Sequence, residues 1–296
     1  MKKLLVPMDF SQESINAFRF ALDMAGRMEA SLLLLNVVPL PVLRNTPFMS
    51  MGEYKRHLVR QLSQTAQKRF SKLSSQYNTA NIKIETSLVS GRVHNAILEC
   101  VQKQNIDFII MGTKGAEGIR ELIVGSQTEK IVRYSPVPLM AVKEYHSELS
   151  IRNIVFPNML DTEHQEDLVS KVKELQHLFG ATLHLTWVNT PARHRPDAAI
   201  RHDLQALADW FMLQDYTINV FNYSDEESGI VEFTRLVDGD LIAMGTHGAK
   251  GINHLIRGSL AEDVVNHVRV PVWTYCPKSA ARHSTQKTIR WSGKAS

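Results

Sequence analysis

The amino-acid sequence predicts an α/β protein of two tandem domains, each a doubly wound, five-stranded parallel sheet. The chain has 296 residues, which suits two domains of about 150 residues each. Short apolar runs typical of buried strands, such as Leu32–Val38, alternate with amphipathic helical patterns. Moreover, Met111–Val132 recurs as Met244–Val265, and 13 of these 22 aligned residues are identical.

Both copies of this repeat carry the glycine spacing G-x2-G-x9-G-S between an apolar run and a helical pattern. The residues are Gly112, Gly115, Gly125 and Ser126 in the first copy, and Gly245, Gly248, Gly258 and Ser259 in the second. A glycine loop between a strand and a helix lets backbone N–H groups converge on an anion. We therefore expect a nucleotide-phosphate site in each domain.

With this motif in this context, the chain resembles the universal stress protein family of the UspA type, over nearly its whole length. In that family the motif marks the members that bind ATP. The resemblance implies a Rossmann-like, adenine nucleotide alpha hydrolase-like fold with strand order 3-2-1-4-5. It also implies that the fifth strands, Leu139–Val142 and Val272–Tyr275, pair within one chain as a pseudo-dimer. Homodimer formation is left open.

The elements of the first domain follow in order. Leu4–Val6 is an apolar run ended by Pro7, and Ser11 is the expected N-cap of the following helix, with Glu13 in its first turn. Pro39–Gly52 is expected to be a loop. The remaining predicted strands and helices are Leu32–Val38, Glu53–Leu73 (with Leu58, Leu62, Ala66 and Phe70 inward), Ile82–Val89, Val93–Val101, Asp107–Met111, Ser126–Tyr134 and Pro138–Val142.

The second domain repeats this order after a polar linker, Lys143–Ser150. We expect domains at 1–143 and 150–276, followed by a basic tail, Pro277–Ser296, that we expect to be disordered. The predicted elements are Ile154–Phe156, Leu168–Phe179, Leu183–Val188, Ala198–Leu213, Thr217–Tyr223, Ile230–Leu236, Asp240–Met244 and Val270–Tyr275.

The family resemblance adds further candidate ligand contacts in the first domain. Asp9 follows the first strand, where open α/β sheets place ligands, and the resemblance assigns it to the adenosine part of ATP. Val37 and Met111 are expected beside adenine. Taken singly, Asp9 fits a turn or cap, and Val37 and Met111 fit the core. The other candidates are Pro7, Gln127 and Thr128, whose hydroxyl lies one turn into the helix.

The second domain keeps the glycines and the serine but differs elsewhere. Met159 aligns with Asp9, Ala261 with Thr128, and Trp187 with Asn36. The loss of the carboxylate removes a hydrogen-bond acceptor for ribose or base. We therefore expect a strong nucleotide site in the first domain and a weaker or altered one in the second.

Composition excludes several classes of protein. The net charge is +4, but the basic tail holds five Lys and Arg residues and no carboxylate, so the remainder carries −1. Nucleic acid is therefore not an expected partner. The cysteines Cys100 and Cys276 lack metal-type spacing and fit a reducing cytosol. No apolar run is long enough to cross a membrane, and the N-terminus is expected to form a strand rather than a signal peptide.

The leading functional hypothesis is a cytoplasmic, ATP-binding, nucleotide-responsive regulator of a protein partner that the sequence does not identify. Neither P-loop nor dinucleotide motif is present, and no catalytic or metal-binding residues are predicted, with Mg²⁺ beside ATP left open. Two alternatives are an interaction scaffold whose nucleotide sites are unused and a slow ATP hydrolase.

Overall fold

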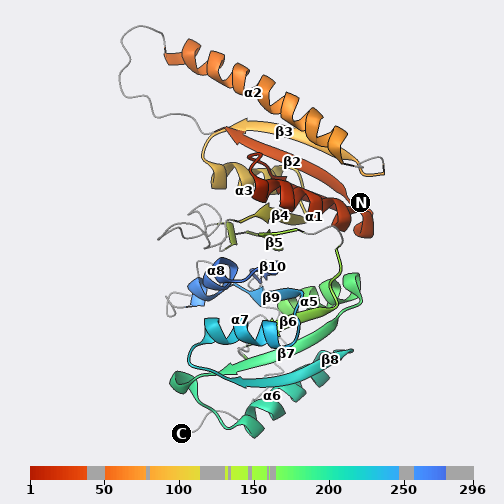
Figure 1. The fold of residues 1–296 in the computed structure, drawn as a ribbon, viewed down its shortest axis with the longest axis vertical. Helices are drawn as coiled ribbons and strands as arrows, with labels where there is room; N and C mark the ends of the chain where they lie inside the picture. Colours follow the sequence, from red (N-terminus) through yellow and green to blue (C-terminus); the bar gives the residue numbers. More distant parts are fainter. Residues whose placement is uncertain are drawn as a thin grey trace, which may run out of the picture. The chain divides into compact units, whose positions relative to one another are not determined.

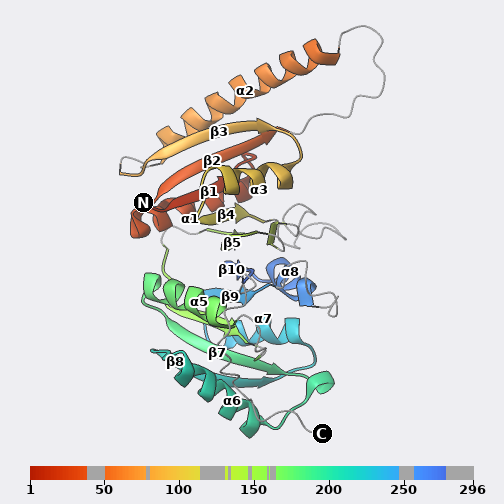
Figure 2. The same cartoon turned by 180° about the vertical axis from the view of Figure 1, so that it is seen from behind.

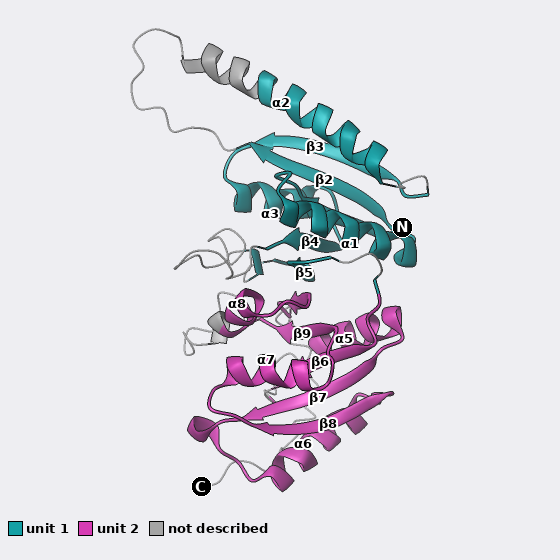
Figure 3. Cartoon of the chain, viewed as in Figure 1, with its two compact units in different colours: residues 1–149 teal, residues 150–296 magenta. Residues whose placement is uncertain are grey.

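The chain forms two compact units, Met1–Leu149 and Ser150–Ser296 (Figure 3). The computed structural model describes residues 1–38, 51–77, 81–113, 131–132, 135–145, 149–158, 160, 165–246 and 257–277. Within these, only the backbone is described for residues 51–59 and 257–259. The basic tail, apart from Pro277, lies outside the described residues.

The first unit is a parallel sheet flanked by helices (Figure 1). Its strands run in the order β3-β2-β1-β4-β5, and every described pairing between them is parallel. This confirms the strand order that the family resemblance implied. The elements are β1 (Lys3–Pro7), α1 (Gln12–Met28), β2 (Ser31–Val38), α2 (Met51–Gln76), β3 (Ile84–Ser90), α3 (Val93–Lys103), β4 (Phe108–Gly112) and β5 (Leu139–Val142).

The first strand and helix show how the sequence produces this arrangement. Leu4, Leu5 and Val6 are fully buried, as expected for a strand covered on both faces. Ser11 caps α1 as predicted: its Oγ accepts a hydrogen bond from the Ser14 backbone N–H at 3.3 Å. The buried face of α1 packs on β1 and β4, so the helix bridges the centre of the sheet.

The second unit has the same topology, with strand order β8-β7-β6-β9-β10 and parallel pairing (Figure 2). Its elements are β6 (Asn153–Pro157), α5 (Gln165–Phe179), β7 (Thr182–Asn189), the 3-10 turn η1 (Pro191–Arg193), α6 (Asp197–Trp210), β8 (Tyr216–Asn222), α7 (Glu226–Leu236), β9 (Leu241–Gly245), α8 (Arg257–His267) and β10 (Val272–Tyr275). The expected pairing of the two fifth strands stays a prediction.

The helix α2 differs in two ways from the sequence expectation. It begins at Met51, so Met51 and Gly52 are helical although the preceding loop was expected to include them. Residues 39–50 lie outside the described part of the chain. Ala66, Phe70 and Leu73 form the buried face, whereas Leu62, expected to point inward, is 36% exposed. None of the described helices has the length and apolarity needed to span a bilayer.

Candidate functional site

The candidate site lies where the strand order of the first unit reverses. From β1 the chain moves to β2 and β3 on one side, and then returns to β4 on the other side of β1. The carboxyl ends of β1 and β4 therefore lie next to each other, and the connections that leave them diverge. Ligands of open α/β sheets bind in this crevice. Asp9 follows β1 by two residues, and Gly112 is the last residue of β4.

The Asp9 carboxylate is fixed by the residues that begin α1. Its Oδ1 accepts hydrogen bonds from the Ser11 backbone N–H at 2.9 Å and from the Ser11 hydroxyl at 2.5 Å. Partial burial raises the pKa of Asp9. The hydrogen bonds from Ser11 and neighbouring groups together lower the pKa by more than burial raises it, so the resulting pKa is below the usual aspartate value. Asp9 is thus an exposed, ionised acceptor with a defined orientation.

Gly112 lies against the first turn of α1. A Cβ on this residue would lie 2.3 Å from the backbone carbonyl carbon of Glu13 and 2.7 Å from the Ser14 nitrogen. Backbone atoms cannot move aside as a flexible side chain can, so the position requires glycine. The expected reason was close approach to phosphate. The structure shows a packing requirement that joins the end of β4 to the start of α1, and contact between Gly112 and phosphate stays a prediction.

Met111 and Val37 lie on the opposite face of the sheet from α1. The register Leu5↔Ile109, continued by two residues, sets Met111 level with Pro7, which pairs with Leu35. Because side chains alternate along strands, Met111 and Val37 share one face. Met111 is 6% exposed, and Val37 and Pro7 are partly exposed. Both core packing and ligand contact are compatible with this placement.

Phe10 is a site residue that the sequence did not indicate. It has a left-handed backbone, with φ of 65°, which is unfavourable for a bulky side chain. Its ring packs on Phe70 of α2 at a centroid distance of 5.0 Å, and the Arg69 guanidinium lies 5.4 Å from its ring centroid. The turn that holds Asp9 is therefore in direct contact with α2.

The glycine loops lie mostly outside the described residues. This applies to the predicted ligands Gly115, Gly125, Ser126, Gln127, Thr128 and Gly248. In the second unit, the backbone of Gly258 and Ser259 belongs to the first turn of α8, which begins at Arg257. The N–H groups of a first helical turn have no partner within the helix, and they carry its positive dipole end. The glycine–serine pair therefore lies within the helix rather than in a turn before it.

A threonine follows β4 and β9 at the start of both glycine loops. Thr113 and Thr246 are 2% and 3% exposed, and within the described part of the chain neither hydroxyl has a hydrogen-bond partner. Their backbone N–H groups are satisfied by Val142 and Tyr275 of the neighbouring strands. The sequence could have indicated Thr113 and Thr246 as candidate site residues, because the tripeptide Met-Gly-Thr is identical in both copies of the repeat.

The second unit differs from the first at the end of β7. Asn189 is 2% exposed, and its Nδ2 donates to the Arg195 carbonyl at 2.9 Å and to Asn222 Oδ1 at 2.9 Å. Asn189 Oδ1 accepts from the Arg195 backbone N–H at 3.1 Å. The Arg195 guanidinium lies 5.4 Å from the Trp187 ring centroid and pairs with Asp203 at 2.5 Å. The segment after β7 is thereby folded back onto the strand end.

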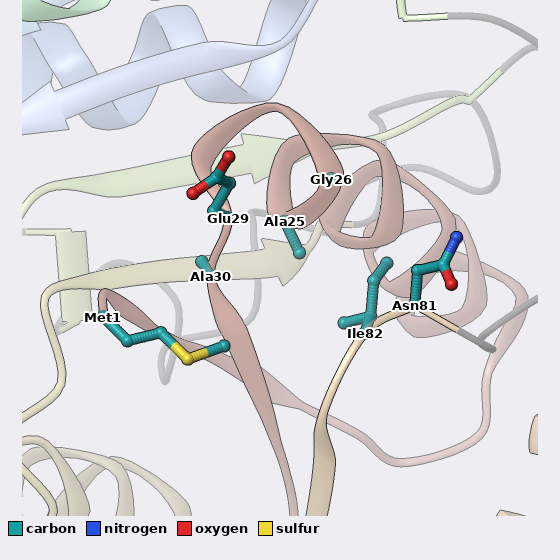
Figure 4. Close-up of a pocket in the computed structure, with 7 residues that line it drawn as sticks. All are labelled: Met1, Ala25, Gly26, Glu29, Ala30, Asn81 and Ile82. Atoms are coloured by element: carbon teal, nitrogen blue, oxygen red, sulfur yellow. The ribbon is translucent and has the colours of Figure 1, made fainter.

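A cavity of 480 Å³ lies at the opposite, amino edge of the first unit, among the end of α1 and the starts of β1 and β3 (Figure 4). It is lined by Met1, Ala25, Gly26, Glu29, Ala30, Asn81 and Ile82. None of the predicted ligand residues borders it, and parallel sheets bind ligands at the other edge, so we do not assign it to the nucleotide. Among the described residues, no His, Cys, Asp and Glu group suits a metal ion.

Comparisons with known proteins agree on one family. The model of the universal stress protein family matches residues 1–143 and 220–275. Universal stress protein MJ0531 of Methanocaldococcus jannaschii is 28% identical over 147 residues, covering 50% of this chain and 85% of the relative. Universal stress protein MJ0577 of the same organism is 24% identical over 157 residues, covering 49% and 97%. The crystal structure of a universal stress protein from Archaeoglobus fulgidus has a TM-score of 0.72 at 20% identity, covering 93% of this chain and 98% of the other.

Proposed function

Since this chain belongs to the universal stress protein family, we propose that its first unit binds ATP at the carboxyl ends of β1 and β4 and that the nucleotide regulates its interactions. The observation that carries the proposal is the placement of Asp9 and Gly112 at the point where the strand order reverses.

The Asp9 carboxylate suits the ribose or base of a nucleotide. Both hydrogen bonds from Ser11 end on Oδ1, which leaves Oδ2 to accept from a ribose hydroxyl or a base amino group. A carboxylate held in one orientation binds a neutral donor without first losing rotational freedom. Val37 and Met111 then supply apolar contact to adenine from the face opposite α1.

The phosphates belong at the glycine loop. Because the two repeats share the Gly-Ser pair, the helix start seen at Gly258 and Ser259 supports the same arrangement at Gly125 and Ser126. The N–H groups of that first turn, together with the helix dipole, favour a bound anion. Mg²⁺ would accompany the triphosphate as its counter-ion.

A regulatory role is supported by the contact between the Asp9 turn and α2. A nucleotide bound at Asp9 lies one residue from Phe10, whose ring packs on Phe70 of α2. A ligand that shifts this turn therefore also changes the packing of α2, and it stabilises whichever arrangement binds it more tightly. An interaction scaffold with unused sites and a slow ATP hydrolase are the alternatives.

We propose that the second unit binds nucleotide more weakly. Met159 and Ala261 stand where the first unit has Asp9 and Thr128, so two polar groups are missing. In addition, Arg195 and Trp187 occupy the end of β7. One nucleotide per chain is thus the expected stoichiometry.

The test is to purify the full chain without added nucleotide, denature it, and quantify adenine nucleotides by anion exchange. About one ATP per chain is expected, with saturating ATP at ~100 times its Kd adding about 2.7 kcal/mol to stability. Asp9→Ala should abolish both effects. Asp225→Ala is the matched control, because Asp225 also precedes a helix and caps it through the Ser228 N–H.

Other outcomes separate the alternatives. Two ATP per chain would show that the second site is intact. No nucleotide, and no rebinding with ATP and Mg²⁺, would support the scaffold. ADP that accumulates linearly during incubation with ATP, and that is lost in Ser126→Ala, would support the hydrolase.

A further inference from the structure

Charge is distributed unevenly between the two units. Residues 1–149 hold 19 Lys and Arg against 13 Asp and Glu, a net +6, whereas residues 150–276 hold 10 against 17, a net −7. The near-neutral total of the folded body therefore conceals two opposite halves. Such an asymmetry points to a surface that attracts a charged partner.

Most of the positive charge lies on α2. This helix contains six Lys and Arg and one Glu, whereas the equivalent helix of the second unit, α6, contains one Arg and three Asp. At 26 residues α2 is about 39 Å long, while β3, on which it packs, has seven residues and spans about 23 Å. Figures 1 and 2 show α2 lying outside β3, at the edge of the first unit's sheet.

Three basic side chains of α2, among those that the structure describes, face solvent without carboxylate partners. Arg60, Lys68 and Lys72 are exposed, and within the described residues none of them forms an ion pair. On other helices, several surface cations form ion pairs with a carboxylate of their own helix. Examples are Lys103–Glu99 at 3.0 Å, Lys171–Glu174 at 2.7 Å and Arg235–Glu232 at 3.4 Å. The α2 face therefore has unneutralised charge available to a partner.

We propose that this face of α2, defined by Arg60, Lys68 and Lys72, binds an acidic segment of a partner protein. The three positions lie within about 18 Å along the helix axis, which an extended segment of about six residues can follow. The intervening exposed residues, among them Gln64, Gln67 and Ser71, add neutral hydrogen-bonding groups between the charges. These charges belong to α2 whether or not the first unit binds nucleotide.

Two other polyanions fit this surface less well. Single-stranded nucleic acid requires aromatic platforms for stacking, but among the α2 residues whose side chains are described, 60–76, the aromatic residue Phe70 is buried. A membrane surface requires several exposed apolar side chains beside the cations. Among residues 60–76 of α2, Leu62 is the exposed large apolar residue, so this face does not suit a membrane.

The experiment measures fluorescence anisotropy of a labelled peptide of about twelve alternating Glu and Ser residues with the full chain, at ~20 mM and ~150 mM salt. We expect binding that weakens with salt. The triple variant Arg60→Gln, Lys68→Gln, Lys72→Gln should bind about tenfold more weakly. The control triple Lys103→Gln, Lys171→Gln, Arg235→Gln removes the same charge elsewhere and should bind as the unmodified chain does.

Several results would overturn the proposal. These are no peptide binding at low salt, equal weakening in both triple variants, or preferential binding of a DNA oligonucleotide of the same charge. Sedimentation that shows α2-dependent self-association at low salt would identify a second copy of the chain as the partner instead. Thermal unfolding of each variant confirms that the fold is retained.

Discussion

Gly112 at the end of β4 lies directly against the backbone of Glu13 in the first turn of α1, close enough that a Cβ would be 2.3 Å from the Glu13 carbonyl oxygen. The end of β4 and the start of α1 can therefore pack this closely only because residue 112 has no side chain. At the equivalent residue of the second unit, Gly245, the atoms nearest to a Cβ all belong to the flexible Leu168 side chain, the first at 2.8 Å.

This difference predicts unequal effects of one substitution. Gly112→Ala must displace α1 or β4, and we expect it to lower the free energy of unfolding of the first unit by about 3 kcal/mol. Gly245→Ala should cost about 1 kcal/mol, because Leu168 can change rotamer. Urea unfolding of both variants checks this, and equal costs would contradict the packing argument.

The lowered pKa of Asp9 predicts that the stability of the first unit depends on pH. Because its folded pKa is lowered, the ionised carboxylate contributes stability that is fully present above the unfolded pKa of about 3.9 and is lost as pH falls through the folded pKa. Asp9→Asn should remove this contribution and flatten the stability profile at acid pH. Thermal unfolding from neutral to acid pH measures it.

Ser11 provides the control for that experiment. Its hydroxyl both donates to Asp9 and caps α1, so Ser11→Ala removes the main cause of the lowered pKa. The effects of Asp9→Asn and Ser11→Ala should be less than additive in the double variant. Strict additivity would show that the two side chains act independently.

Phe10 and Leu160 occupy equivalent positions in the two units and both have positive φ, 65° and 53°. The shared conformation supports the alignment of Met159, which lies outside the described residues, with Asp9. A left-handed backbone costs a non-glycine residue about 1–2 kcal/mol. Leu160→Gly should therefore give a more stable protein than Leu160→Ala, by about 1 kcal/mol in urea unfolding. The reverse order would rule out strain at this turn.

The central strands were predictable from sequence because they are short, nearly continuous apolar runs, as in Leu32–Val38, whereas the outer strands β3 and β8 mix apolar and polar residues. The strand order came from the glycine motif and its family, not from periodicity. The left-handed Phe10 could not be foreseen, since bulky residues rarely adopt this conformation and no glycine or asparagine marks the position.

The roles of single residues were harder to predict than the elements. The motif predicts a phosphate contact for Gly112, which stays a prediction, but it gives no sign of the packing on Glu13, a residue 99 positions away in sequence. Leu62 fits the spacing of the apolar face, yet it is 36% exposed because α2 is longer than the strand it covers. Periodicity predicts a face but not where the underlying sheet ends.

The Arg195–Asp203 pair beside Trp187 predicts that substitution of Arg195 lowers the stability of the second unit more than substitution of Asp203 does. Asp203 is 3% exposed, whereas the Arg195 side chain is 30% exposed. Arg195→Met leaves a buried carboxylate without its main partner and should lower the free energy of unfolding by about 3 kcal/mol. Asp203→Asn leaves an arginine that can turn toward water, so its cost should be about 1 kcal/mol. Urea unfolding measures the cost of each variant. Arg201→Met is the control, because it removes an exposed arginine from α6, the helix that carries Asp203. If Asp203→Asn costs more, the pair stabilises the unit chiefly through Arg195 and its position over Trp187.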